Sequence, residues 1–360
     1  MTVAWILAAG LGTRLRPLTE QRPKPLLEVC GRPLVVHTLQ LLANAGVTDV
    51  ALNSHWLHPA IPRALGDTVV VDGVTMALHF TWEPTVLGTG GGLAGLRSIL
   101  PGDGGRALIA NADALIDLDV TALLATADDA LSTLVLKGVP DVARYGAIGT
   151  DDDDRIVTFA GRVPPLGIVA RERMFCGWHC VHPRALDVLP PVVVDTATTP
   201  PTAGGVESCI NKEGYPHWLK QDALLRGQDH RGLFLDVGTP ERLWEANRVL
   251  LTGEVQPTSL TPFARFTEQP GRVFVHPGAR IDPTATLVGP CLVDDGAVVA
   301  ADAEVGPLAV IGRGVTVARG VRVTRSVVQS SWQKTLDVDV DADGVHVFDD
   351  GTAGRVGIDS

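Results

Sequence analysis

A six-residue repeat in the last third of the chain constrains the fold more than any other feature. An aliphatic residue recurs at every sixth position from Val275 to Val323, nine times without exception. Four residues after each of these stands a small or β-branched residue, from Ala279 to Val327. A hexapeptide β-helix requires this pattern, because each face of its coil turns one aliphatic side chain inward beside a small one. The repeat predicts a β-helix of about three coils.

The chain before this repeat has a different pattern, in which short apolar runs alternate with segments of helical period. This alternation predicts βαβ units around a Rossmann-like, mixed but mainly parallel sheet. We expect a loop over Asp195–Gly205. The expected strands are Val3–Ala9, Thr48–Asn53 and Ala107–Ala110, and the expected helices are Leu34–Ala45, closed by Gly46, and Val120–Thr126.

Three domains follow from this organisation. Residues 1–252 form the predicted α/β domain, and residues 253–332 form a linker and the hexapeptide β-helix. Residues 333–360 form a tail in which Asp343 and Gly344 suit the turn of a hairpin.

Composition and charge narrow the class of protein. A net charge of -11 argues against a general nucleic-acid binder, which needs a basic face. Five cysteines without regular spacing indicate reduced thiols. The first residues lack the basic start of a signal peptide, and no apolar run reaches the roughly 18 residues of a membrane span. We therefore expect a cytoplasmic protein with no membrane partner.

A glycine-rich turn directly after the first strand predicts a phosphate site. Gly10 and Gly12 allow backbone N–H groups to approach a phosphate closely, and Thr13 adds a hydroxyl. Arg14 projects from the end of this turn and can bind a β,γ-pyrophosphate through its planar fork of donors. Lys24 stands between two prolines, which fix the backbone around a cation able to stabilise charge on an α-phosphate.

Three other interpretations of the glycine turn are weaker. A lone Gly-x-Gly is most often only a tight turn. A Rossmann dinucleotide site needs a third glycine where Leu15 stands. A Walker loop needs a following Gly-Lys-Ser/Thr, which is absent.

The segment Gly10–Thr19, together with Pro23–Pro25, resembles the sugar nucleotidyltransferase signature G-x-G-T-R-L-x-P-L-T followed by P-K-P. With a left-handed hexapeptide β-helix behind it, the chain resembles mannose-1-phosphate guanylyltransferases and related enzymes over residues 1 to about 332. The resemblance implies transfer of a nucleotidyl group from a nucleoside triphosphate to a sugar 1-phosphate, with release of pyrophosphate. It also implies that Leu7 and Ala8 border the nucleotide.

The segment Glu83–Gly92 resembles the base-binding stretch of this family, with Gly88 and Thr89 at the nucleotide and a helix from Leu93. A carboxylate only accepts hydrogen bonds, so Glu83 suits the adjacent N–H donors of guanine and favours GTP. The alternatives that remain are a surface Glu83 that never touches the base, and an enzyme that uses UTP or dTTP.

Two aspartates at the ends of expected strands match the metal ligands of the family. Asp113 belongs to Asn111-Ala-Asp, and Asp236 belongs to Asp-Val-Gly-Thr-Pro240. Strand ends are where open α/β sheets bind ligands, and hard oxygen ligands suit Mg²⁺. The resemblance therefore implies that Asp113 and Asp236 hold Mg²⁺ on the α-phosphate.

The sugar-binding half departs from the family pattern. The resemblance implies roles for Asn111, Gly146 and Arg162 at the sugar phosphate, but Gly161-Arg-Val163 replaces the usual Glu-Lys-Pro, and Phe175-Cys-Gly177 replaces Asn-Ala-Gly. His179, near Cys180 and His182, is expected to pack in a core strand rather than bind metal. Mannose 1-phosphate is favoured as the acceptor on family resemblance alone.

Competing hypotheses remain for the whole chain. One is a regulatory subunit that senses nucleotide sugars without catalysis, although it would have no need to retain Arg14, Lys24, Asp113 and Asp236 together. Another is a second, acyltransferase activity in the β-helix, which holds only His276 as a candidate base. The β-helix also suits assembly of a homo-oligomer.

Overall fold

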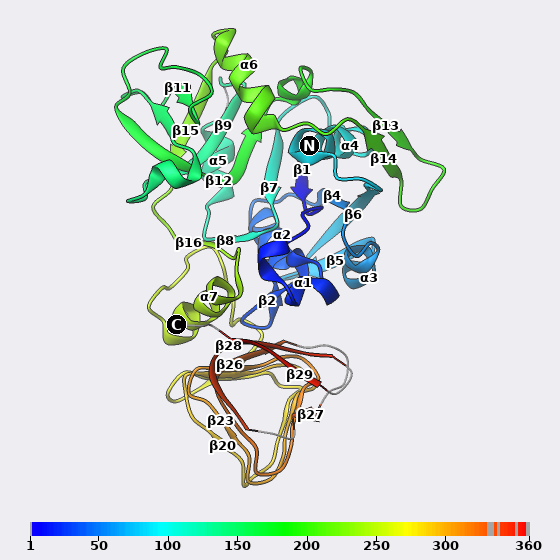
Figure 1. Cartoon of the computed structure of the whole chain (residues 1–360), viewed down its shortest axis with the longest axis vertical. Helices are drawn as coiled ribbons and strands as arrows, with labels where there is room; N and C mark the ends of the chain where they lie inside the picture. The colour runs from blue at the N-terminus through cyan, green and yellow to red at the C-terminus, as the bar shows by residue number, and fades with distance from the viewer. Residues whose placement is uncertain (1, 128, 330–334, 337–338, 350–351, 358–360) are drawn as a thin grey trace. The chain divides into compact units, whose positions relative to one another are not determined.

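The computed structural model describes residues 2–127, 129–329, 335–336, 339–349 and 352–357 (Figure 1). Its contacts divide the chain into two compact units, each built from two stretches of sequence. The first unit contains Met1–Leu11 and Thr38–Phe234, and the second contains Gly12–His37 and Leu235–Ser360. The predicted domain boundary at residue 252 stays a prediction, since these units divide the chain elsewhere.

The first unit is built on a large mixed sheet whose centre is parallel. Strand β1 (Val3–Leu7) lies between β4 (Asp49–Ser54) and β7 (Ala107–Asn111), and both pair with it in parallel. β4 pairs in parallel with β6 (Val74–Trp82), whereas β12 (Arg171–Val181) runs antiparallel to β7. Helices separate these strands along the chain, so the predicted mixed, mainly parallel α/β fold is confirmed.

Most of the remaining strands of the first unit extend this sheet, whereas β8 pairs with β16 in a separate two-stranded sheet. Its other strands are β5 Thr68–Val71, β8 Ala114–Ile116, β9 Ser132–Lys137, β10 Ile148–Thr150, β11 Ile156–Phe159, β13 Val192–Asp195, β14 Thr202–Gly205 and β15 Leu225–Asp229. Its helices are α3 Ala60–Leu65, α4 Gly88–Ile99, α5 Val120–Ala125 and α6 Tyr215–Lys220, with 3₁₀ turns at Val142–Tyr145 and Pro183–Leu186 and a π turn at Ile210–Gly214. Two elements span both units: α2 Leu34–Asn44 and β16 Phe234–Asp236.

Two expectations for the first unit are wrong. The stretch 195–205 is not a loop throughout: β13 and β14 pair as an antiparallel hairpin, and Thr202 joins the sheet beside Trp82. The helix expected from Leu93 begins at Gly88, so the glycine-rich stretch forms its first turns. A Cβ at Gly90 would lie 2.5 Å from Ser208 Oγ, so close packing explains a glycine there.

The second unit contains a parallel coil with a period of three six-residue repeats. Val273 pairs with Cys291 and Cys291 with Ala309, and the other two faces repeat in the same way, as in Arg280 with Val298. The inward aliphatic and small residues form one buried cluster along the coil. Figure 1 shows the coil end-on as stacked triangles.

The elements of the second unit belong to the N-terminal segment, a helix and the coil. The N-terminal segment holds the 3₁₀ turns η1 Thr13–Leu15 and η2 Lys24–Leu26, helix α1 Leu18–Gln21 and strands β2 Glu28–Val29 and β3 Arg32–Pro33. The remaining elements are helix α7 Pro240–Thr252 and strands β17 Thr267–Gln269, β18 Val273–Val275, β19 Arg280–Ile281, β20 Thr286–Leu287, β21 Cys291–Val293, β22 Val298–Val299, β23 Glu304–Val305, β24 Ala309–Ile311, β25 Thr316–Val317, β26 Arg322–Gln329, β27 Thr335–Leu336, β28 Val340–Asp349 and β29 Thr352–Gly357.

The last coil departs from the strict repeat. Val293 pairs with Ile311, eighteen positions on, but Ile311 pairs with Val328, so one residue is missing from this coil. Val328, rather than the expected Val327, therefore joins the inner cluster. The tail forms a hairpin of β28 and β29, but it is not the predicted one: Gly344 lies within β28 opposite Gly357, so the turn expected at Asp343 and Gly344 is wrong.

The outer side of one coil face is also buried. Phe274, Leu292, Val310 and Val327 alternate with the inward residues and are all 2% exposed or less. Phe274 stacks on Phe263 of the preceding linker at 4.0 Å between ring centroids, and α7 packs against β26 and β28. This face is therefore an internal interface of the second unit. Among the described residues, no helix is both long and apolar enough to cross a bilayer.

Candidate active site

The glycine turn and the candidate lysine meet in the second unit. Gly12 has a φ of +61°, and its carbonyl accepts a hydrogen bond from Thr19 Oγ1 at 2.9 Å. A Cβ at Gly12 would lie 3.3 Å from Cβ of Lys24, so the loop and the lysine are in van der Waals contact. Lys24 is 7% exposed, with Pro23 and Pro25 buried on either side of it. The prolines hold this backbone as the sequence predicts.

Arg14 and Asp236 meet at a second glycine. A Cβ at Gly238 would lie 3.1 Å from Arg14 Nη2 and 3.0 Å from Asp236 Oδ1. Only a residue without a side chain leaves this space, so Gly238 lets the guanidinium and the carboxylate approach the same backbone. Arg14 is itself exposed in the middle of η1. The second unit thus brings together candidates from both ends of the sequence.

Arg242 is a site residue that the sequence analysis did not include. It lies in the first turn of α7, where Thr239 caps the helix by accepting from the Arg242 N–H. Its guanidinium donates from Nη1 to Oδ2 of Asp236, which is the predicted metal ligand. The sequence did contain a signal for this residue. Thr239 is a typical helix N-cap residue after the strand that ends at Asp236, and Arg242, three positions later, lies in the first turn of that helix.

In the first unit, a chain of hydrogen bonds links the end of β1 to the expected base-binding stretch. The Ala8 N–H donates to Asn53 Oδ1 at 2.7 Å, and Asn53 Nδ2 donates to Glu83 Oε1 at 2.6 Å. Glu83 Oε2 accepts from the Leu87 N–H at 3.0 Å. Glu83 is 1% exposed. Burial raises the pKa of its carboxyl group, although these hydrogen bonds act in the opposite direction and lower it.

This geometry corrects one of the two interpretations of Glu83. Glu83 does not lie on the surface, because both carboxylate oxygens are engaged inside the unit. It fixes the distance between β1 and the loop before α4. The guanine contact expected of its side chain stays a prediction, but the carboxylate of this structure serves Asn53 and Leu87.

The glycines at the start of α4 pack against residues 206–209. Gly88 has a φ of +68°, and its missing Cβ would lie 2.3 Å from the Ser208 carbonyl. The Gly90 N–H donates to that carbonyl at 2.9 Å. Thr89 Oγ1 donates to Cys209 Sγ at 3.3 Å and accepts from the Ile210 N–H at 3.2 Å. Ser208 was not found from the sequence, since nothing in its local pattern marks it.

The other predicted nucleotide residues lie in both units. Leu7 ends β1 and pairs with Asn111, which ends β7. Ala8 is buried beside Asn53, whereas Gly10 is exposed with no atom within 4 Å of the Cβ position. Thr13 is exposed at the start of η1 in the second unit. An exposed glycine with open space beside it suits the approach of a phosphate.

The predicted sugar residues lie in two regions of the first unit. A Cβ at Gly177 would lie 2.9 Å from Asn111 Nδ2, so the replaced Asn-Ala-Gly segment packs on the end of β7. Gly146, with a φ of +80°, follows the 3₁₀ turn at Val142–Tyr145. Arg162 is exposed in the turn after β11. His179 is 1% exposed and hydrogen-bonded to Tyr215, which confirms core packing.

The candidate metal ligands lie in different units, Asp113 just after β7 and Asp236 before α7. Within the described part of the chain, no three His, Cys, Asp or Glu side chains cluster as a ready-made metal centre. The donor chemistry fits Mg²⁺ nonetheless, because carboxylate oxygens together with phosphates and waters are its usual ligands. Asp236 keeps a quarter of its side chain exposed.

Comparison with known proteins places the chain among nucleotidyl transferases. The nucleotidyl transferase family profile matches residues 3–163. The mannose-1-phosphate guanylyltransferase of Mycobacterium tuberculosis is 30% identical over 309 residues, covering 84% of this chain and 76% of that protein. The mannose-1-phosphate guanyltransferase of Eremothecium gossypii is 31% identical over 280 residues, covering 77% of this chain and 72% of that protein.

A solved structure shares the fold. The crystal structure of HddC from Yersinia pseudotuberculosis superposes with a TM-score of 0.54 at 21% identity, covering 69% of this chain and all of that one. The fold, the complete signature and the identity to the curated relatives over most of both lengths agree. The chain belongs to the sugar-1-phosphate nucleotidyltransferase family.

Proposed function

We propose that this protein transfers GMP from GTP to mannose 1-phosphate, giving GDP-mannose and pyrophosphate. The observation that carries the proposal is the assembly of the signature in the second unit, where Lys24 contacts Gly12 and Arg14 shares Gly238 with Asp236. The names of the relatives from Mycobacterium tuberculosis and Eremothecium gossypii support GTP and mannose 1-phosphate as the substrates.

The reaction is a single in-line displacement at the α-phosphorus. The sugar phosphate needs no general base, because a phosphate monoester is already ionised near pH 7. The fork of Arg14 binds the departing β,γ-pyrophosphate, and Lys24 stabilises the charge that builds on the α-phosphate. Asp113 and Asp236 would hold Mg²⁺, which supplies charge neutralisation at the phosphates. Asn111, Gly146 and Arg162 serve the sugar phosphate in this proposal.

The base preference does not rest on Glu83. The Glu83 carboxylate is buried and bonded on both oxygens, and in this proposal it supports the base-binding stretch through the Leu87 N–H and Asn53. Gly88 and Thr89, fixed by Ser208 and Ile210, offer backbone beside which a flat base can lie. Preference for GTP over UTP or dTTP is therefore proposed from the relatives.

The proposal includes four further properties of the family. The coil is a left-handed β-helix, the metal is Mg²⁺, the enzyme works in the cytoplasm, and it forms a homo-oligomer through the coil. Parallel coils carry exposed edges that pack against copies of themselves, which is the support for the last point.

The experiment is pyrophosphate release with Mg²⁺, using each nucleoside triphosphate in turn against a panel of sugar 1-phosphates. We expect turnover with GTP and mannose 1-phosphate. Asp113→Asn and Asp236→Asn should each abolish it with an unchanged circular dichroism spectrum, and near-normal rates in either would contradict the metal assignment. Activity only with UTP or dTTP would keep the reaction class and remove the base assignment. Silence across the panel with nucleotide sugars still bound would favour a regulatory subunit.

A further inference from the structure

The backbone that follows Lys24 is held by side chains from the other end of the chain. This lysine segment, residues 24–33, consists of η2 and the small antiparallel pair β2–β3. It belongs to the second unit, together with α7 and the coil. Four of its backbone groups are hydrogen-bonded to side chains of α7, the linker or the coil.

Gln329 binds one residue of this segment with both ends of its amide. Gln329 Oε1 accepts from the Glu28 N–H at 3.1 Å, and Nε2 donates to the Glu28 carbonyl at 2.8 Å. Gln329 is 1% exposed, so water does not compete for these bonds. Pro33, opposite Glu28 in the β2–β3 pair, has no N–H to donate. Gln329 therefore supplies a donor that the strand partner lacks.

The missing residue in the last coil explains why Gln329 is available. With the strict eighteen-residue period, the partner of Ile311 would be Gln329, and its amide would face the apolar interior of the coil. The shorter register pairs Ile311 with Val328 instead. Successive residues of a strand point to opposite faces, so Gln329 faces outward, on the side of the coil against which α7 packs. Val323 still keeps the eighteen-residue spacing from Val305, whereas Val327 lies seventeen positions after Val310, so the residue is lost between Val323 and Val327, where Arg325 has a φ of +44°.

Two further contacts fix the turn of the segment. Asn247 of α7 accepts from the Cys30 N–H at 2.7 Å through Oδ1, and its Nδ2 donates to the Leu243 carbonyl. Arg265 of the linker donates to the Gly31 carbonyl and to Asp294 Oδ2, the latter at 2.8 Å. Asp294 is fully buried in the coil, where Arg265 is its ion-pair partner.

We propose that Gln329 is a positioning residue for Lys24. By fixing the Glu28 backbone four positions after Lys24, it removes the freedom of the segment to tilt and holds the lysine stem at the Gly12 loop. A long, flexible lysine stabilises a transition state well only if its backbone is fixed beforehand. The catalytic part of this inference rests on the role proposed for Lys24, whereas the tether to the coil stands on the hydrogen bonds alone.

The chain contains two natural reporters for the tether. Cys30 lies in the lysine segment and Cys291 in the core of the coil, and both are 0% exposed. Burial raises the pKa of the Cys30 thiol and raises that of Cys291 to about 12, so both are protected from alkylation in the closed state. Alkylation by iodoacetamide, followed by peptide mass spectrometry, gives a separate opening rate for each.

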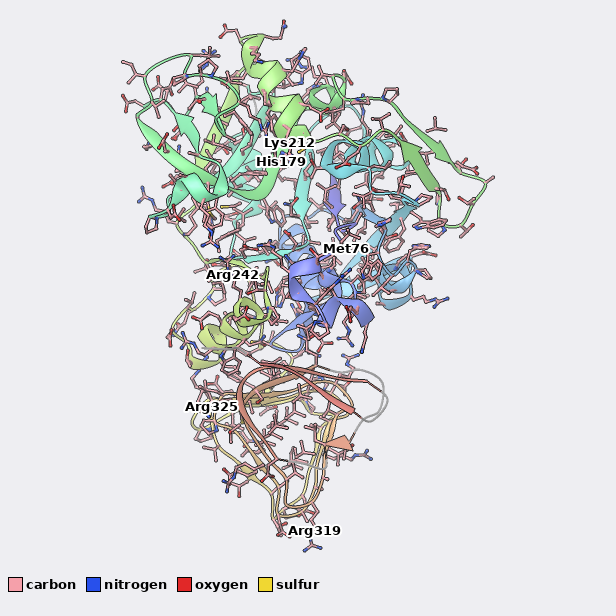
Figure 2. All side chains as sticks on the ribbon, viewed as in Figure 1. Met76, His179, Lys212, Arg242, Arg319 and Arg325 are labelled. Carbon is pink, nitrogen blue, oxygen red and sulfur yellow. The ribbon has the colours of Figure 1, made fainter. Side chains whose placement is uncertain are left out.

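Gln329→Met keeps the length of the side chain and removes both hydrogen bonds. We expect Cys30 to be alkylated about tenfold faster or more, with Cys291 unchanged. The control is Arg319→Met on the same coil, where the Arg319 side chain is 79% exposed, and it should leave both cysteines protected. Figure 2 shows Arg319 at a corner of the coil far from Arg242 and Arg325. Unchanged protection of Cys30 would overturn the proposal. If both cysteines of Gln329→Met react faster, the substitution has opened the coil itself. Gln329→Asn, which is shorter by one methylene, is then measured instead, and unchanged protection of Cys30 in that variant would overturn the proposal.

A double-mutant cycle tests whether the tether acts through Lys24. Gln329→Met should lower kcat about tenfold in the wild-type background, and less than about twofold in the Lys24→Ala background. A general loss of structure would lower both rates by the same factor, and that result would overturn the positioning role. A wild-type enzyme that is inactive on the whole substrate panel would refute the proposed function, and the Cys30 measurement would still decide the tether.

Discussion

Gly12→Ala is the substitution whose effect the structure predicts most directly. The backbone of Gly12 has a φ of +61°, and holding a residue with a Cβ there costs about 1–2 kcal/mol. The added Cβ would also lie 2.9 Å from Thr19 Cγ2 and 3.3 Å from Lys24 Cβ. Carbon atoms in contact prefer about 3.5–4.0 Å, so the loop or Lys24 must move by roughly half an ångström.

That displacement sets the expected loss of activity. A catalytic group misplaced by about 1 Å can cost about 10²-fold, so we expect kcat of Gly12→Ala to fall about tenfold in the pyrophosphate-release assay. The control is Gly46→Ala, at the end of α2, where φ is +74° and no atom lies within 4 Å of the Cβ position. This variant carries the same backbone cost without touching Lys24, so it should unfold at a lower temperature and keep its kcat. Equal kcat in the two variants would refute the reasoning.

Three further predictions follow from the described contacts. Burial lowers the pKa of His37 from 6.5 to about 3, so only the unfolded chain gains a proton at this residue as the pH falls below 6.5. The free energy of unfolding, measured in urea, should therefore fall by about 2 kcal/mol between pH 7.5 and 5 because of His37. His37→Leu should lose this part of the pH dependence. Arg242→Gln removes the ion pair with Asp236 and should raise the Mg²⁺ concentration for half-maximal activity about tenfold. Arg242→Lys, which keeps the charge, should raise this concentration less. An unchanged Mg²⁺ titration would contradict an orienting role for Arg242. Glu83→Gln places an N–H donor opposite the amide of Asn53 or the Leu87 N–H, so it should lower the stability of the fold. The ratio of kcat/KM for GTP to that for UTP should change less than about threefold. A larger change would favour a direct contact between Glu83 and guanine.

The parts of the fold that the sequence predicted depend on short-range periodicity. The six-residue repeat marked the inward residues of the coil because each position faces the same environment in every turn. The strands around Trp5 and Ile109 were recognisable because strands buried on both faces are continuously apolar. The signature Gly10–Thr19 identified the family for a related reason, since its chemistry lies in consecutive residues.

The parts that were missed depend on partners far along the chain. Gly88–Gly92 reads as a loop, because a local pattern cannot show that Ser208 and Asn53 leave no room for side chains on that helix. The hairpin within 192–205 lacks apolar alternation and gains its register from the edge at Trp82. Glu83 reads as a surface or base-binding residue, whereas Asn53 and Leu87 make its burial tolerable.

The division of the second unit between the two ends of the chain has a consequence for biosynthesis. Glu28 and Gln329 are 301 positions apart, so a ribosome adding about 5–20 residues per second makes the two partners roughly 15–60 s apart. The nascent signature segment has no α7 to fold against until residues 240–252 have been made, and the coil follows later still. We expect fragments released before this point to contain the central sheet but to lack the contacts of residues 12–37 with α7 and the coil, and therefore to be inactive.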